Sequence, residues 1–243
     1  MSSATGIPEE NPATNHRTAE DEPLLGRRGD ASQQDGKGIQ FNLVLGTAII
    51  AQAGIWILTA TIWASVFIHP VILFSAHPLL NISSLLLLTQ SILLLQPTHT
   101  PHQKNLGTHI HAILNTTSIL SLLASLIIIE YNKISHGGTH FVSPHAILGL
   151  ITYILFGIQG IVGITQFYFP NVYGGVEKAK RIYKWHRWSG YLILTLALAT
   201  VCAATQTDYN KGVLHVRLWA VLVASVITLV GVLPRVRKAK LGL

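Results

Sequence analysis

Histidine is the residue type whose number and placement in this sequence indicate chemistry. Four of the 12 histidines fall within or at the edge of long apolar stretches, namely His77, His111, His145 and His186. An ionisable side chain in apolar surroundings is costly, so each of the four is a candidate functional residue. Imidazoles in such places ligate metals or relay protons. Proton relays usually include Asp or Glu, and the apolar stretches contain neither, which favours metal ligation.

The apolar stretches that carry these histidines are long enough to cross a lipid bilayer. Only 11% of the residues are charged and 49% are hydrophobic, which is too little charge to cover a water-soluble globule of 243 residues. Six stretches have roughly 18 residues or more, the length of a transmembrane helix. They cover residues 41–63, 71–95, 108–129, 144–167, 188–205 and 216–233. We therefore expect an all-α protein, a bundle of six transmembrane helices.

Polar segments flank this apolar region at both ends. Residues 1–40 show no apolar periodicity and are rich in Gly, Ser, Glu, Asp and Gln, a composition typical of disordered chain. We expect a disordered cytoplasmic tail over residues 1–40, a transmembrane domain over residues 41–234 and a short basic cytoplasmic tail over residues 235–243.

The distribution of basic residues predicts the orientation of the helices in the membrane. If the helices alternate in direction, only Lys133, Lys211 and Arg217 of the 17 Lys and Arg residues fall on the side opposite to the termini. Cytoplasmic segments carry the excess of Lys and Arg, so we expect both termini in the cytoplasm. The basic residues lie in separate loops, so the net charge of +7 does not indicate nucleic acid as a partner.

The predicted helix directions place the four histidines at two depths in the membrane. His77 and His145 lie near the beginning of helices that enter from the non-cytoplasmic side. His111 and His186 lie near the beginning of helices that enter from the cytoplasm. A low-spin haem iron takes one axial nitrogen from each side of the porphyrin, and facing helices supply an apolar slot. Two imidazole pairs at two depths therefore predict two b-type haems within the four central helices.

A glycine follows two of these histidines at the spacing of one helical turn. Gly149 lies four residues after His145, and Gly190 lies four residues after His186, so each glycine shares a helix face with its histidine. The missing side chain leaves room for a flat porphyrin. The alternative interpretation is that these glycines let two membrane helices approach closely.

His109 competes with His111 as a ligand, because only one residue separates them. On a helix they point roughly 200° apart, so they cannot serve the same iron. We choose His111, which lies deeper and has Asn115 on its own helix face as a polar neighbour. His109 stays open as the alternative.

The order and spacing of these segments resemble the eukaryotic cytochrome b561 family, in its members with a single six-helix core and no extracellular accessory domain. The resemblance covers about residues 41–233. It is carried by residues 77–80, His111, residues 141–145 with Gly149, and residues 184–190. It implies two haem b groups, one ligated by His77 with His145 and the other by His111 with His186.

The resemblance also implies a reaction. In this family cytosolic ascorbate supplies an electron that crosses the membrane and reduces monodehydroascorbate or a ferric chelate on the other side. The protein would then be an ascorbate-dependent transmembrane oxidoreductase in which haem iron, and no side chain, carries the chemistry. The alternative is a haem-binding membrane sensor or structural subunit that transfers no electrons productively.

Substrate contacts follow from the same resemblance. Ascorbate is an anion, so its cytoplasmic contacts would fall on basic residues, for which the candidates are Lys104, Arg181, Lys184 and Arg187. The alternative for each is the ordinary enrichment of basic residues on the cytoplasmic side. On the opposite side His140 and Phe141 resemble the family's acceptor segment. The sequence departs from the family at Pro144, which suits the first turn of a helix but replaces the usual polar or aromatic neighbour of His145.

A short motif in the predicted amino-terminal tail bears on the location of the protein. Residues 20–25 have the form of an acidic dileucine sorting signal. This motif indicates a vacuolar, lysosomal or other endomembrane location, with the plasma membrane as the alternative. The sequence leaves open whether the protein is a monomer or a homodimer.

Overall fold

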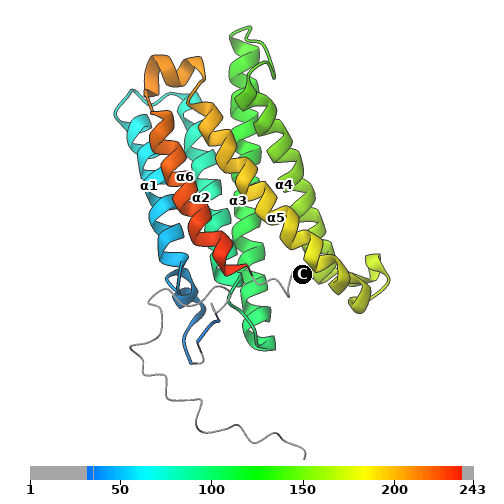
Figure 1. Ribbon diagram of the computed structural model, residues 1–243. Helices are drawn as coiled ribbons and strands as arrows, with labels where there is room; N and C mark the ends of the chain where they lie inside the picture. Colours follow the sequence, from blue (N-terminus) through cyan, green and yellow to red (C-terminus); the bar gives the residue numbers. More distant parts are fainter. Residues whose placement is uncertain (1–31, 35, 237–243) are drawn as a thin grey trace, which may run out of the picture.

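The computed structural model describes residues 32–34 and 36–236, and its long elements are six α-helices (Figure 1). They are α1 Ala48–Phe67, α2 Ala76–Leu95, α3 Pro101–Ser135, α4 Pro144–Tyr168, α5 Val176–Ala204 and α6 Leu218–Val232. The short helical turns beside them are η3 Ile39–Leu43, η4 Leu73–Ser75, η5 Pro170–Tyr173, η6 Asn210–Leu214 and η7 Leu233–Arg235. With their adjoining turns, all six are long and apolar enough to cross a membrane. The prediction of an all-α bundle of six membrane-spanning helices is confirmed.

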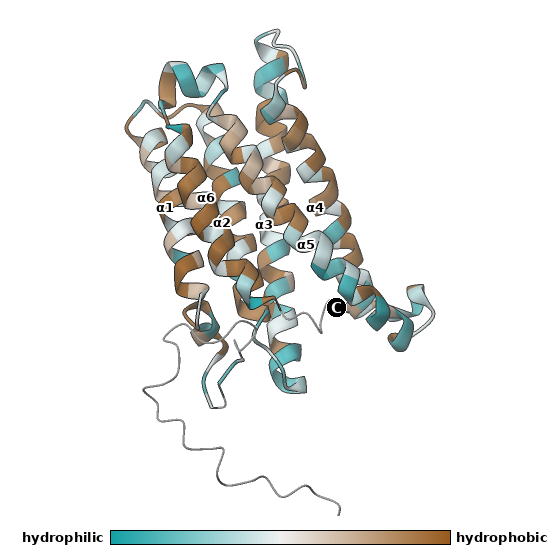
Figure 2. Ribbon diagram, viewed as in Figure 1, coloured by the Kyte–Doolittle hydropathy of each residue, from teal (hydrophilic) through white to brown (hydrophobic). Residues whose placement is uncertain are grey.

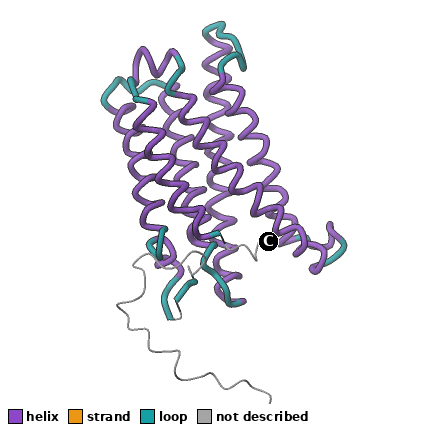
Figure 3. The backbone as a smooth tube through the Cα atoms, in the orientation of Figure 1, coloured by secondary structure: helices purple, strands orange, loops and turns teal. Residues whose placement is uncertain are grey.

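Successive helices run in opposite directions, and their connections lie at the two ends of the bundle (Figure 3). α1 packs mainly on α6 and α2, α2 packs on α3, and α4 packs on α5. α2 also contacts α5, and it is the most deeply buried of the six helices. Because α4 also contacts α3, the four helices that carry the candidate histidines, α2 to α5, form a closed ring of neighbours.

The close packing of α1 on α6 depends on two glycines. A Cβ atom on Gly54 of α1 would lie 2.5 Å from the backbone nitrogen of Thr228, and a Cβ atom on Gly231 of α6 would overlap the backbone of Ala51. Small residues at helix contacts are typical of membrane proteins, in which close van der Waals contact supplies much of the packing energy. The two helices can therefore touch along their backbones.

Local signals determine where α3 and α4 begin. The hydroxyl of Thr100 before α3, and that of Ser143 before α4, each accept a hydrogen bond from the backbone nitrogen three residues further on. Each is followed by a proline in the first turn, where a helix needs no N–H group. Pro144 thus begins α4 directly before His145.

Two helices begin earlier than the hydropathy of the sequence predicted. α3 begins at Pro101 and not at residue 108, and α5 begins at Val176 and not at residue 188. Figure 2 shows hydrophilic residues in these added turns, which explains why an apolar pattern did not include them. His111 and His186 each lie about three turns inside their helices. The prediction that these two histidines lie near the beginning of their helices was therefore wrong.

In the part of the chain that the structure describes, residues from both predicted tails pack against the helix bundle. Gln33 is buried, and its side-chain oxygen accepts a hydrogen bond from Asn42. Arg235 is also buried, and its guanidinium donates to the carbonyl oxygens of Asn42 and Leu93. The domain boundaries at residues 40 and 235 stay predictions, and single buried polar residues such as these leave no periodic pattern in the sequence. The sorting motif at residues 20–25 lies outside the described residues.

The variant Gly231→Ala tests the contact between α1 and α6. We expect the added methyl group to push the two helices apart and to destabilise the protein by about 1–3 kcal/mol, the usual cost of overpacking. Thermal unfolding of the purified protein in detergent measures the effect. Gly157→Ala is the matched control, since a Cβ atom on Gly157 of α4 meets nothing within 4 Å. Equal stability of Gly231→Ala and the parent would contradict this packing.

Candidate functional site

The structure brings His77 and His145 together from the first turns of α2 and α4. The centres of the two imidazole rings are 6.3 Å apart, and the rings are nearly perpendicular. His77 Nδ1 lies 3.1 Å from the carbonyl oxygen of Ser125, and His145 Nδ1 lies 3.1 Å from the carbonyl oxygen of Thr200. A carbonyl oxygen only accepts, so each Nδ1 carries the proton of the neutral ring. Nε2 is then left as a metal ligand.

His111 and His186 form a second pair, from α3 and α5. Their ring centres are 6.5 Å apart, and His111 Nδ1 lies 3.2 Å from the carbonyl oxygen of Ser91. Nδ1 of His186 is buried and has no hydrogen-bond partner within residues 32–34 and 36–236. Because His77 and Ser91 are 14 residues apart on α2, the two pairs are separated by roughly 20 Å along the bundle.

Both pairs have the spacing that a shared metal ion requires. Two metal–nitrogen bonds of about 2 Å, together with the half-widths of two rings, give ring centres roughly 6 Å apart. Three of the four imidazoles also make the Nδ1–H···O=C hydrogen bond that orients ligating histidines. In the described residues no group of three or more His, Cys, Asp or Glu side chains could hold a metal ion. Two imidazoles that face each other at this distance fit a haem iron, which needs only two protein ligands.

A cavity of about 470 Å³ lies between α2, α3, α4 and α5, with His77 and His145 in its wall. Leu85, Leu122 and Phe156 are among the apolar residues that line it, which suits a bound porphyrin.

The two glycines that follow ligand candidates differ in their surroundings. Gly149 lines the cavity beside His145, as expected for a residue that leaves room for a flat ligand. A Cβ atom on Gly190 would lie 3.2 Å from Nε2 of Gln159 on α4. The space beside Gly190 is therefore filled by a side chain of α4.

The polar surroundings of His77 recur around His111. α2 and α3 share one pattern at an offset of 34 residues, formed by His77, Asn81, Ser84 and Ser91 and by His111, Asn115, Ser118 and Ser125. Each asparagine donates to the carbonyl of the histidine on its own helix and to the serine hydroxyl of the other helix. The two middle serines exchange hydrogen bonds. This repeat is visible as a spacing in the sequence, but the prediction did not include it.

His109 lies apart from the second pair. Its Nδ1 is 2.8 Å from the hydroxyl of Tyr168, and its ring contacts Phe167 near the end of α4. The structure thus brings His111, and not His109, to His186.

The basic candidates lie on the amino-terminal parts of the two helices that carry the His111–His186 pair. One is on α3 and three are on α5: Lys104, Arg181, Lys184 and Arg187. Lys184 Nζ lies 5.3 Å from the centre of the Trp185 ring. The guanidinium carbon of Arg187 lies 6.0 Å from the centre of the Tyr183 ring. Two of these cations thus lie against aromatic rings of α5.

His140 and Phe141 line the same cavity as the His77–His145 pair. His140 Nδ1 lies 2.8 Å from Oε2 of Glu130, and Lys133 also lines this part of the cavity. Phe141 has a φ of 53°, an uncommon conformation for a bulky residue and one that is often found at functional sites. Glu130 and Lys133 were not predicted as site residues, because they follow the apolar stretch that was expected to end at residue 129.

Comparisons with known proteins agree with this architecture. The family model of eukaryotic cytochrome b561 matches residues 76–211, more than half of the chain, and this range includes all four histidines. A protein of Oryza sativa subsp. japonica named probable ascorbate-specific transmembrane electron transporter 1 is 39% identical over 64 residues. That alignment covers 26% of this chain and 26% of the rice protein, so the chain matches about a quarter of its relative's length. With a family match of this extent on six membrane-spanning helices, the protein belongs to the eukaryotic cytochrome b561 family, a family of haem b proteins in electron transport.

Proposed function

We propose that this protein carries electrons across a membrane from ascorbate to monodehydroascorbate or a ferric chelate, and that it holds two haem b groups. The observation that carries the proposal is the spacing of the facing imidazoles, 6.3 Å in one pair and 6.5 Å in the other. The roughly 20 Å between the pairs covers much of a hydrocarbon core about 30 Å thick. Two redox groups at these positions would connect the two faces of the bilayer.

The ligands of the two haems are His77 with His145 and His111 with His186. When bound, haem supplies the reversible one-electron chemistry of its iron. The side chains and backbone of the protein orient the ligands. Three imidazoles donate Nδ1–H to a carbonyl of a neighbouring helix, which keeps Nε2 unprotonated. The apolar part of the cavity wall would surround a porphyrin bound at the His77–His145 pair.

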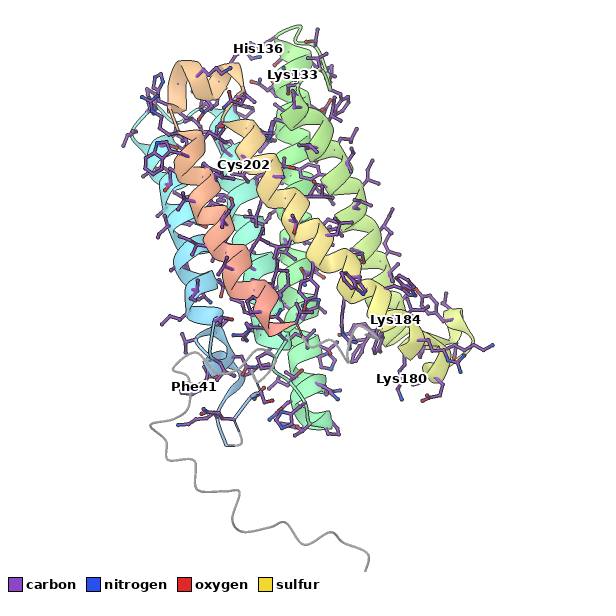
Figure 4. The ribbon with its side chains drawn as sticks, viewed as in Figure 1. Phe41, Lys133, His136, Lys180, Lys184 and Cys202 are labelled. Carbon is purple, nitrogen blue, oxygen red and sulfur yellow. The ribbon has the colours of Figure 1, made fainter. Side chains whose placement is uncertain are left out.

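In this proposal the end of the bundle with the His111–His186 pair faces the cytoplasm. Lys180 and Lys184 lie at that end, whereas Lys133 lies at the opposite end (Figure 4). Cytoplasmic segments of membrane proteins carry the excess of basic residues, so this arrangement supports cytoplasmic termini.

Ascorbate is the proposed donor at the cytoplasmic end, and the name of the rice relative supports this choice. The ascorbate monoanion loses one electron and one proton to become monodehydroascorbate. The field of several cations raises the local concentration of such an anion. The candidate cations are Lys104 on α3 and Arg181, Lys184 and Arg187 on α5, the two helices that carry this pair.

The acceptor is proposed to bind at the opposite end, beside His140 and Phe141. One electron reduces a ferric chelate to the ferrous state, and one electron with one proton converts monodehydroascorbate to ascorbate. The imidazole of His140, held by Glu130, and the ammonium of Lys133 are the hydrogen-bonding groups available to these acceptors.

The variants His145→Ala and His186→Ala test the ligand assignment. We expect two haems per chain in the parent and one in each variant, because each loses one axial ligand of a different iron. The haem-to-protein ratio of the purified protein measures this. His109→Ala is the control and should keep two haems. Loss of a haem from His109→Ala but not from His111→Ala would overturn the choice of His111.

Electron transfer itself is tested with sealed lipid vesicles. Vesicles that contain the protein and are loaded with ascorbate should reduce an external ferric chelate, while vesicles with His145→Ala should do so at only the leak rate of protein-free vesicles. The absorbance of the ferrous product measures the rate. Haem-loaded protein that ascorbate does not reduce would favour the alternative, a haem-binding sensor or structural subunit.

The variant Lys184→Ala tests the ascorbate contact. We expect the KM for ascorbate to rise about tenfold, since a hydrogen bond to a charged group is lost, while the rate at saturating ascorbate changes little. Steady-state reduction of the ferric chelate measures both. The control is Lys178→Ala, which removes an exposed cation at the start of α5. An equal KM in both variants would show that Lys184 only anchors the helix at the membrane surface.

A further inference from the structure

A chain of hydrogen bonds runs from Tyr153 on α4 to His77. The Tyr153 hydroxyl donates to Oδ1 of Asn81 at 2.6 Å, and Nδ2 of Asn81 donates to the hydroxyl of Ser125 at 2.5 Å. The same hydroxyl oxygen lies 2.9 Å from His77 Nδ1. Tyr153 also lines the cavity beside the His77–His145 pair. A phenol on a helix that carries one ligand is thereby linked to the imidazole of the other ligand.

The second half of the repeat has the asparagine and the serine but not the phenol. Asn115 donates to the Ser91 hydroxyl at 2.9 Å, as Asn81 does to Ser125, yet its Oδ1 is buried without a hydrogen-bond partner in the described part of the chain. Tyr153 follows His145 by eight residues, and the residue eight positions after His186 is Leu194. The two histidine sites therefore share the asparagine and the serine, and the phenol is found at the His77–His145 site.

The direction of these hydrogen bonds predicts their effect on His77. Donation from Tyr153 polarises the Asn81 amide and strengthens its donation to Ser125, because linked hydrogen bonds reinforce one another. His77 Nδ1–H faces both the carbonyl oxygen of Ser125 at 3.1 Å and its hydroxyl oxygen at 2.9 Å. A hydroxyl oxygen that already accepts a strong hydrogen bond contributes less as an acceptor for this N–H. A weaker acceptor at Nδ1 leaves the imidazole less basic, and a less basic axial ligand stabilises ferric iron less.

We propose that Tyr153 is a positioning residue that, through Asn81 and Ser125, raises the reduction potential of the haem at His77 and His145 relative to the haem at His111 and His186. The proposal rests on the proposed function, because it requires a haem at each pair. The haem at His77 and His145 would then have the higher reduction potential of the two. This difference favours electron flow from the cytoplasmic side to the opposite side.

The test is a redox titration of the haem absorption bands in the full-length protein and in Tyr153→Phe. Tyr153→Phe should keep two haems per chain, and one midpoint potential should fall while the other stays in place. The reduction equilibrium constant of the affected haem should change by about threefold to tenfold, which corresponds to the net strength of one hydrogen bond. The affected haem should be the one that is missing from His145→Ala.

Three further variants separate this role from a purely structural one. Ser125→Ala should change the same midpoint potential. Adding Tyr153→Phe to Ser125→Ala should then change that potential very little, since both substitutions act on the same chain of hydrogen bonds. Ser91→Ala should leave the potential of the haem at His77 and His145 unchanged, because the Ser91 hydroxyl bonds Asn115 and not the groups around His77. Tyr173→Phe is the control, because its hydroxyl bonds Thr165 and not Asn81.

Two results would overturn the proposal. The first is a Tyr153→Phe variant that binds both haems with unchanged midpoint potentials, which would leave the proposed function intact. The second applies if Tyr153→Phe fails to bind haem: unchanged midpoint potentials in Ser125→Ala would then refute the role of Tyr153. A parent protein with fewer than two haems would instead refute the proposed function.

Discussion

A polar side chain within a bilayer must find its hydrogen-bond partner inside the protein, because hydrocarbon offers none. The imidazoles in this bundle meet that requirement with backbone oxygens of neighbouring helices. A helical carbonyl already accepts one bond from its own helix, but its second lone pair is free to accept another. The carbonyls of Ser91, Ser125 and Thr200 use it for three of the four histidines. The orientation of each ring therefore depends on a helix other than its own.

The same requirement explains how so many polar residues fit into apolar helices. Serine and threonine hydroxyls donate hydrogen bonds to backbone carbonyls of their own helices, as those of Thr59 and Thr89 do. Gln52 and Gln90 exchange two hydrogen bonds between α1 and α2. At the end of α2 the buried guanidinium of Arg235 is surrounded by carbonyl oxygens, including that of Leu93. These pairings tie α1 and the end of α6 to the central helix without requiring buried carboxylates.

The sequence was sufficient to predict six helices and the histidines that face one another, because hydropathy and helix direction together determine the depth of each residue. It was not sufficient for the helix starts, since the polar turns before His111 and His186 lie beyond the apolar stretches. Backbone acceptors such as the Ser125 carbonyl leave no signature in residue types. The burial of Arg235 was missed for a related reason, because a charge satisfied only by carbonyls resembles a basic tail in the sequence. Glu130 was missed because its proximity to His140 depends on how far α3 continues.

The repeat shared by α2 and α3 makes the length of both helices a constraint in its own right. On α2, the imidazole of one site and the carbonyl acceptor of the other site are 14 residues apart, and the same holds on α3. Inserting or deleting one residue between them would rotate one end of the helix by about 100° relative to the other. Such an insertion or deletion, in α2 or in α3, would therefore misplace the imidazole of one site relative to the carbonyl acceptor of the other. Insertions and deletions in related proteins should therefore be confined to the loops between helices. The spacing of 14 residues should be kept even where the side chains between the two positions differ.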